Sequence, residues 1–98
     1  MVCFLELQPV SDLKAVEEAP LLIAQWDRPD LSDDCELRYD ITLQNELRLL
    51  TVSTEEKFYN FELVPCTTND ITVIPVTTTV NAVGAAAKLL HVATEGNF

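Results

Sequence analysis

The chain is poor in the residue types on which most phosphate, nucleic-acid and membrane sites depend. It has two glycines, and its six lysine and arginine residues face sixteen aspartate and glutamate residues, which gives a formal net charge of −10. Two glycines are too few for a phosphate-cradling loop, and so acidic a chain does not neutralise nucleic-acid or lipid phosphates. No apolar run approaches the roughly 20 residues of a membrane span. We therefore expect neither nucleic-acid binding nor membrane insertion.

Histidine and cysteine are also too sparse to indicate catalysis or a metal centre. His91 is the only histidine, and no partner at ligand spacing accompanies it. A hydrolase-type triad needs a base beside a nucleophile, and a zinc site needs pairs such as Cys-x-x-Cys or His-x₃-His. Neither pattern occurs, so we expect no enzyme activity, no cofactor and no metal.

Three cysteines, Cys3, Cys35 and Cys66, form an odd set. An odd and small number does not indicate a disulfide framework, and we interpret the three as ordinary thiols. The opening segment MVCFLEL has no basic residue and is interrupted by Glu6, so it does not resemble a signal peptide. The chain is thus either cytosolic or a secreted chain that has been trimmed.

Alternation of apolar and polar side chains is the dominant pattern. In residues 38–44, Tyr39, Ile41 and Leu43 alternate with polar residues, and residues 21–26 place Leu22, Ala24 and Trp26 on one face and Leu21, Ile23 and Gln25 on the other. Such alternation predicts strands with one buried face. For residues 88–94 the pattern leaves open whether Leu90 and Val92 or Leu89 and His91 form the buried set. Residues 11–19 favour a short irregular strand over a helical turn. About seven strands at spacings of roughly 8–12 residues predict an all-β sandwich or barrel.

The order of the motifs resembles a fibronectin type III domain. The resemblance rests chiefly on Leu22-x-Ala24-x-Trp26-x-x-Pro29, Tyr39-x-Ile41-x-Leu43 and Leu63-x-Pro65-x-Thr67. It implies a two-sheet antiparallel β-sandwich over residues 9–98, with residues 1–8 as a linker or an extra N-terminal strand. A related immunoglobulin-like sandwich is the alternative. The implied core residues are Trp26, Tyr39, Ile41, Leu63 and Val73.

One departure from the family pattern lies at the corner before residue 70. The family has a tyrosine two residues after the corner threonine, whereas this chain has Asn69 two residues after Thr67. The tyrosine hydroxyl ties that corner to upstream backbone. We therefore expect the corner to be held by other contacts or to be looser.

The resemblance implies a non-catalytic protein-interaction module of a modular chain, as in cell adhesion, at the cell surface or outside the cell. The acidic loop 27–36 and the loop 77–87 would lie at one end of the sandwich and contact another protein, for which a basic surface would suit the acidic loop. The alternatives are a passive spacer, a secreted antigen domain, or an accessory domain of a cytoplasmic enzyme. The partner-binding candidates are Asp27, Arg28, Asp30, Asp33, Asp34, Asn81 and Gly84.

The implied topology also bears on the cysteines. It places Cys35 and Cys66 at opposite ends of the sandwich, too far apart for the roughly 7 Å that a disulfide allows between Cα atoms. A disulfide between Cys3 and Cys35 remains open, and Cys66 would then be an exposed thiol. Residues 1–8 or Cys66 could join two chains.

Overall fold

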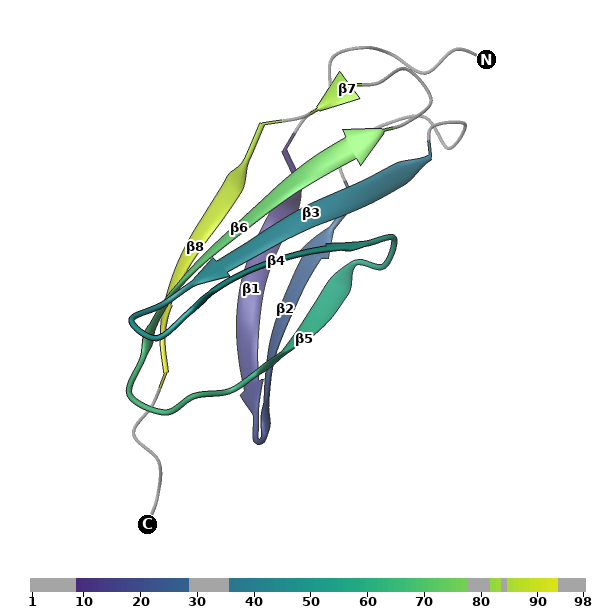
Figure 1. Ribbon diagram of the computed structural model, residues 1–98. Coiled ribbons are helices and arrows are strands. Elements are labelled where there is room, and N and C mark those ends of the chain that lie inside the picture. Colours follow the sequence, from purple (N-terminus) through teal and green to yellow (C-terminus); the bar gives the residue numbers. More distant parts are fainter. Residues whose placement is uncertain (1–8, 29–35, 78–81, 84, 94–98) are drawn as a thin grey trace.

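The computed structural model describes residues 9–28, 36–77, 82–83 and 85–93, and it contains only strands and connections in those ranges (Figure 1). Seven strands have five or more residues, as predicted, and a further strand, β7, has two. The strands are β1 (Ser11–Glu18), β2 (Leu21–Asp27), β3 (Leu37–Gln44), β4 (Leu49–Thr54), β5 (Phe58–Glu62), β6 (Thr68–Thr77), β7 (Ala82–Val83) and β8 (Ala87–Val92).

The strands form two antiparallel sheets that pack as a sandwich (Figure 1). One sheet has three strands in the order β1-β2-β5. In the other sheet β4 pairs with β3 and β3 with β6, while β7 and β8 both pair with β6. The predicted all-β sandwich is confirmed, because every strand pairing within the described residues is antiparallel and each sheet supplies one face to the shared core.

The core follows from the alternation of side chains along each strand. Successive residues of a strand point to opposite faces, so β2 and β3 each turn a set of apolar side chains inward. The rings of Trp26 and Tyr39 meet between the sheets, with centroids 5.3 Å apart and planes at 66°. Burying one large apolar side chain contributes roughly 1.5–3 kcal/mol. The buried members include Leu22, Ala24, Trp26, Tyr39, Ile41, Leu43, Phe61, Ile71 and Val73, and Leu63 is partly buried against them.

Three details differ from the expectation or complete it. β1 is longer than the short strand expected, although its register shifts between Ser11 and Lys14, where Asp12 has a φ of 53°. β7 lies inside the expected 77–87 loop and pairs with the end of β6. In β8 it is Leu90 and Val92 that face solvent, at 65% and 63% exposure.

The sandwich has two ends with different connections. At one end, which we call the Asp27 end, β2 finishes and Leu37 pairs with Thr77. At the other, which we call the Asn69 end, the β3–β4 turn meets the beginning of β6, because Gln44 pairs with Asp70. Cys66 lies in the connection between β5 and β6 at the Asn69 end, where it is an exposed free thiol.

Candidate functional site

The Asp27 end contains two of the predicted partner-binding residues. Asp27 is exposed at the end of β2, and Arg28 beyond it is half-buried. The other candidates lie outside the described residues, as do both cysteines of the conceivable disulfide: Asp30, Asp33, Asp34, Asn81, Gly84, Cys3 and Cys35. The described strands nevertheless bring the limits of both predicted loops together, since Leu37 and Thr77 are direct partners in the ladder.

Arg28 also acts on the core. Tyr39 is only 2% exposed, and its burial raises the pKa of the phenol above the ordinary value, while the positive charge of Arg28 lowers it in part. Desolvation favours the neutral phenol because an ionised group loses hydration in the interior. The charge of Arg28 therefore acts on the core tyrosine as well as on the surface of the Asp27 end.

A groove of about 770 Å³ lies on the solvent-facing side of the three-stranded sheet. Its floor includes Ile23 and Gln25 of β2, and Phe58 and Asn60 of β5 contribute its other side. The register shift in β1 lies beside it, and such bulges bend a strand locally. The groove thus combines a partly apolar floor with a margin shaped by an irregular strand.

Four charged side chains line this groove, two of each sign: Asp12, Lys14, Asp27 and Lys57. None of the four side chains makes an ion pair or a hydrogen bond within the described part of the chain. The groove can therefore receive a surface that carries both charges around an apolar contact. Sequence reasoning missed it because its residues come from three separate segments, and only Asp27 among them was named as a binding candidate.

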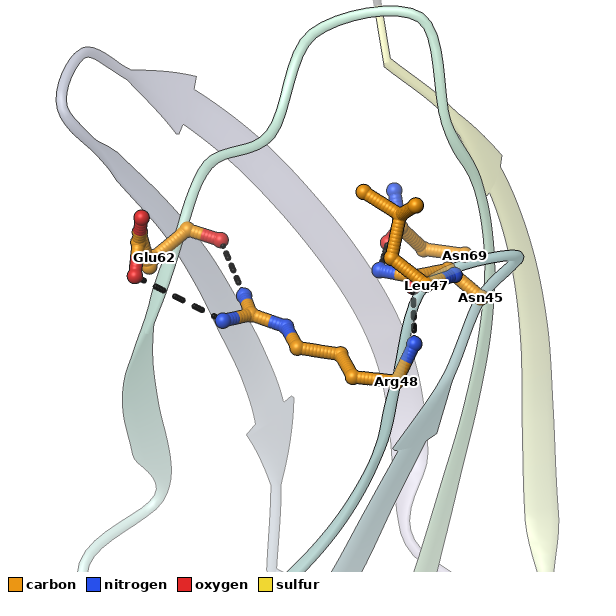
Figure 2. A network of polar contacts seen from close by, with 5 residues as sticks. All are labelled: Asn45, Leu47, Arg48, Glu62 and Asn69. Atoms are coloured by element: carbon orange, nitrogen blue, oxygen red, sulfur yellow. Dashed lines mark hydrogen bonds and ion pairs between the residues drawn. The ribbon is translucent and has the colours of Figure 1, made fainter.

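The Asn69 end is held by a network of side-chain amides (Figure 2). Asn69 is 2% exposed, and its Oδ1 accepts a hydrogen bond of 3.0 Å from Nδ2 of Asn45. Oδ1 of Asn45 in turn accepts from the backbone N–H groups of Leu47 and Arg48, at 2.9 and 3.0 Å. This closes the β3–β4 turn and ties it to β6.

The corner threonine adds two further ties. Oγ1 of Thr67 donates to the carbonyl of Val64 at 2.7 Å, and the carbonyl of Thr67 accepts from the N–H of Ala93 at 2.8 Å. The side chain of Glu46 accepts from the N–H of Thr68 at 2.8 Å. The corner at which a tyrosine was expected is therefore fastened by these contacts.

Polar contacts also join the two sheets at both open edges of the sandwich. At one edge Nη2 of Arg48 donates to the carbonyl of Glu62 at 2.8 Å, and Nη1 lies 3.5 Å from its carboxylate (Figure 2). At the other edge Nε2 of His91 lies 2.9 Å from Oε2 of Glu17 in β1. The sole histidine is thus half-buried in a contact between β8 and β1. Because His91 and Glu17 are 74 residues apart in the sequence, their spacing along the chain could not reveal this contact.

Within the described ranges no group of three or more metal-ligating side chains comes together. The same residues include no helix with the length and apolar character of a membrane span.

Comparison with known proteins gives similarity at the level of structure. No family model and no curated protein sequence matches the chain. A solved structure described as a myokine superposes with a TM-score of 0.70 at 14% identity, covering 90% of this chain and 98% of that one. The fold is fibronectin type III-like. The extracellular region of rat CD45, domains d3–d4, superposes with a TM-score of 0.66 at 11% identity, covering 90% of this chain and half of that one. Identities this low establish the fold alone.

Proposed function

We propose that the chain is a non-catalytic protein-interaction module of a modular extracellular or cell-surface protein, and that it recognises its partner at the Asp27 end. The observation that carries the proposal is the pairing of Leu37 with Thr77, which brings the limits of segments 27–36 and 77–87 to one end of a rigid sandwich. Binding residues occur disproportionately on loops positioned by such scaffolds. The likeness to an extracellular region of rat CD45 supports the cellular location.

The expected partner carries a basic surface. Segment 27–36 contains four aspartates and Glu36 against Arg28, and the described Asp27 is exposed. A negative patch on a chain of net charge −10 attracts a positive surface and speeds encounter with it. Much of the binding would therefore be sensitive to salt, since exposed charges are screened beyond about 8 Å at physiological ionic strength.

The test compares two variants that each remove two negative charges. The first, Asp33→Asn with Asp34→Asn, alters the acidic segment. The matched control, Glu18→Gln with Asp70→Asn, alters two exposed acids away from the Asp27 end. Binding to a panel of ectodomains with basic surfaces is measured by surface plasmon resonance.

We expect a partner selected with the wild-type chain to bind the first variant about tenfold more weakly, mainly through slower association, and the control normally. Unchanged binding of the Asp33/Asp34 variant would show that the acidic segment is not the recognition site. A panel with no binder would favour a passive spacer.

A further inference from the structure

The groove on the three-stranded sheet contains most of the lysines of the chain. Two of the three lysines, Lys14 and Lys57, line it. By contrast, two of the arginines are paired within the chain, Arg38 with Asp40 and Arg48 with Glu62. The groove lysines remain available for contacts with another molecule.

The charges of the groove fall into two neighbouring rows. In the β1–β2 ladder Asp27 pairs with Ser11, next to Asp12, which places the acids at the Asp27 end. Two residues farther along β2, Gln25 pairs with Lys14 on one side and with Phe58 on the other. Lys57 precedes Phe58, and its carbonyl accepts a hydrogen bond from the N–H of Trp26 at 3.1 Å, so its backbone lies level with Trp26, between the two rows. An acidic row thus lies next to a row that contains Lys14, and Lys57 lies beside both.

We propose that this groove is a self-association surface that faces the same groove of a second copy across a twofold axis. An axis lying in the interface, across the strands and between the two rows, sets the acidic row of each copy against the lysines of the other. In a twofold interface every contact occurs twice, so Asp12 and Asp27 of each copy meet Lys14 and Lys57 of its partner.

A second copy is the occupant that matches these charges best. A purely basic partner would leave the lysines unpaired and opposed, and a purely acidic one would do the same to the aspartates. Two copies of net charge −10 repel one another overall. The groove, with two charges of each sign, is a locally neutral place at which they can meet.

The groove also offers the apolar contact that exposed ion pairs need. Such pairs alone contribute only about 0–1 kcal/mol each. Phe58 is 45% exposed at the side of the groove, and Ile23 is half-buried in its floor. Covering these side chains with those of the second copy removes apolar surface from water.

Charge exchange between two variants tests the proposal. The acidic variant carries Lys14→Glu and Lys57→Glu. The basic variant carries Asp27→Lys and Asp12→Asn, because asparagine tolerates the positive φ of position 12 better than lysine does. Masses are measured by sedimentation from about 10 µM to about 1 mM, the range of weak association, in reducing buffer so that Cys66 cannot link chains.

We expect the wild-type chain to dimerise, each variant alone to be monomeric, and their equimolar mixture to form a heterodimer. Recovery on mixing cannot come from misfolded chains. The control variant Lys88→Glu with Asp70→Lys, on the other sheet, dimerises as the wild type does. A monomeric wild type, including one that binds a separate peptide in the groove, or a mixture that stays monomeric, would overturn the proposal. Asp33→Asn with Asp34→Asn leaves dimerisation unchanged, so this test is independent of the proposed partner recognition.

Discussion

Asn69 anchors the corner at which the resemblance to fibronectin type III domains leads one to expect a tyrosine. Its amide joins Asn45 of the β3–β4 turn at 3.0 Å, and Thr67 supplies the bond to upstream backbone. The missing tyrosine was visible in the sequence, but its replacement was not. The replacement depends on Asn45, 24 positions away, and only the paired strands bring the two amides together.

The buried phenol of Tyr39 makes the fold less stable as the pH becomes strongly alkaline. Because its folded-state pKa is raised above the ordinary value of about 10, its stabilising contribution is complete below about pH 10. That contribution is lost as the pH rises from there through the folded-state pKa, since the unfolded chain releases the phenolic proton first.

We expect Tyr39→Phe to abolish this part of the loss of folding stability at alkaline pH. The free energy of unfolding of both proteins is measured by urea denaturation from about pH 8 to about pH 11. The wild type should lose stability faster by up to about 1.4 kcal/mol per pH unit, and other titrating groups cancel in the difference. Parallel curves would show that Tyr39 ionises equally in the folded and unfolded chains.

At the scale of elements, alternation predicted which faces are buried wherever one face is polar. In β3 the apolar set is unmistakable, and Tyr39, Ile41 and Leu43 are buried as the pattern indicates. In β8 both sets contain apolar residues, so the sequence could not choose between them. The structure turns Leu89 inward and leaves Leu90 exposed, because β8 is fixed by its pairing with β6 and by its contact with β1.

The edge contact that Arg48, the residue before β4, makes with β5 depends more on its bond to the backbone carbonyl of Glu62 than on the carboxylate of Glu62. The 2.8 Å bond goes to the backbone carbonyl, whereas the carboxylate is 3.5 Å away on a side chain that is 73% exposed. Exposed ion pairs contribute little, but a hydrogen bond from a charged donor is stronger.

We therefore expect Glu62→Gln to lower the free energy of unfolding by less than about 0.5 kcal/mol, and Arg48→Met, which keeps much of the aliphatic stem, to lower it by roughly 1–2 kcal/mol. Denaturant unfolding at neutral pH measures both, with Arg38→Met, whose ion pair with Asp40 is within one sheet, as the control. If Glu62→Gln and Arg48→Met lower the free energy of unfolding equally, the stabilisation comes from the carboxylate of Glu62 and not from the bond to its backbone carbonyl.

For the whole molecule, the order of the motifs along the chain was enough to predict the sandwich but not its surface. The alternation of apolar side chains and the corner residues determine which sheet faces meet, and Trp26 and Tyr39 do meet. The groove could not be predicted, because its charges come from β1, β2 and the β4–β5 turn, and because it lies beside a register shift that the sequence does not signal. The recognition loops at the Asp27 end remain predictions, since most of their residues lie outside the described ranges.

One shared core predicts cooperative unfolding. Trp26 is the only tryptophan, is 3% exposed, and belongs to the three-stranded sheet while it contacts Tyr39 of the other sheet. Its fluorescence should report loss of the interface, and far-UV circular dichroism reports loss of the strands. For a small single domain we expect the two denaturant curves to coincide. Tryptophan emission that shifts at a lower denaturant concentration would show that the sheets separate before they unfold.

Because Ser11 of the first described strand pairs with Asp27, and Val92 of the last pairs with Thr68, the backbone passes from one end of the sandwich to the other. Units linked through these ends would follow one another in line, each adding about 33 Å if the ten residues of β6 set its length. Tension along such a row would shear β1 and β8 past their neighbours, so that several ladder bonds would have to fail together.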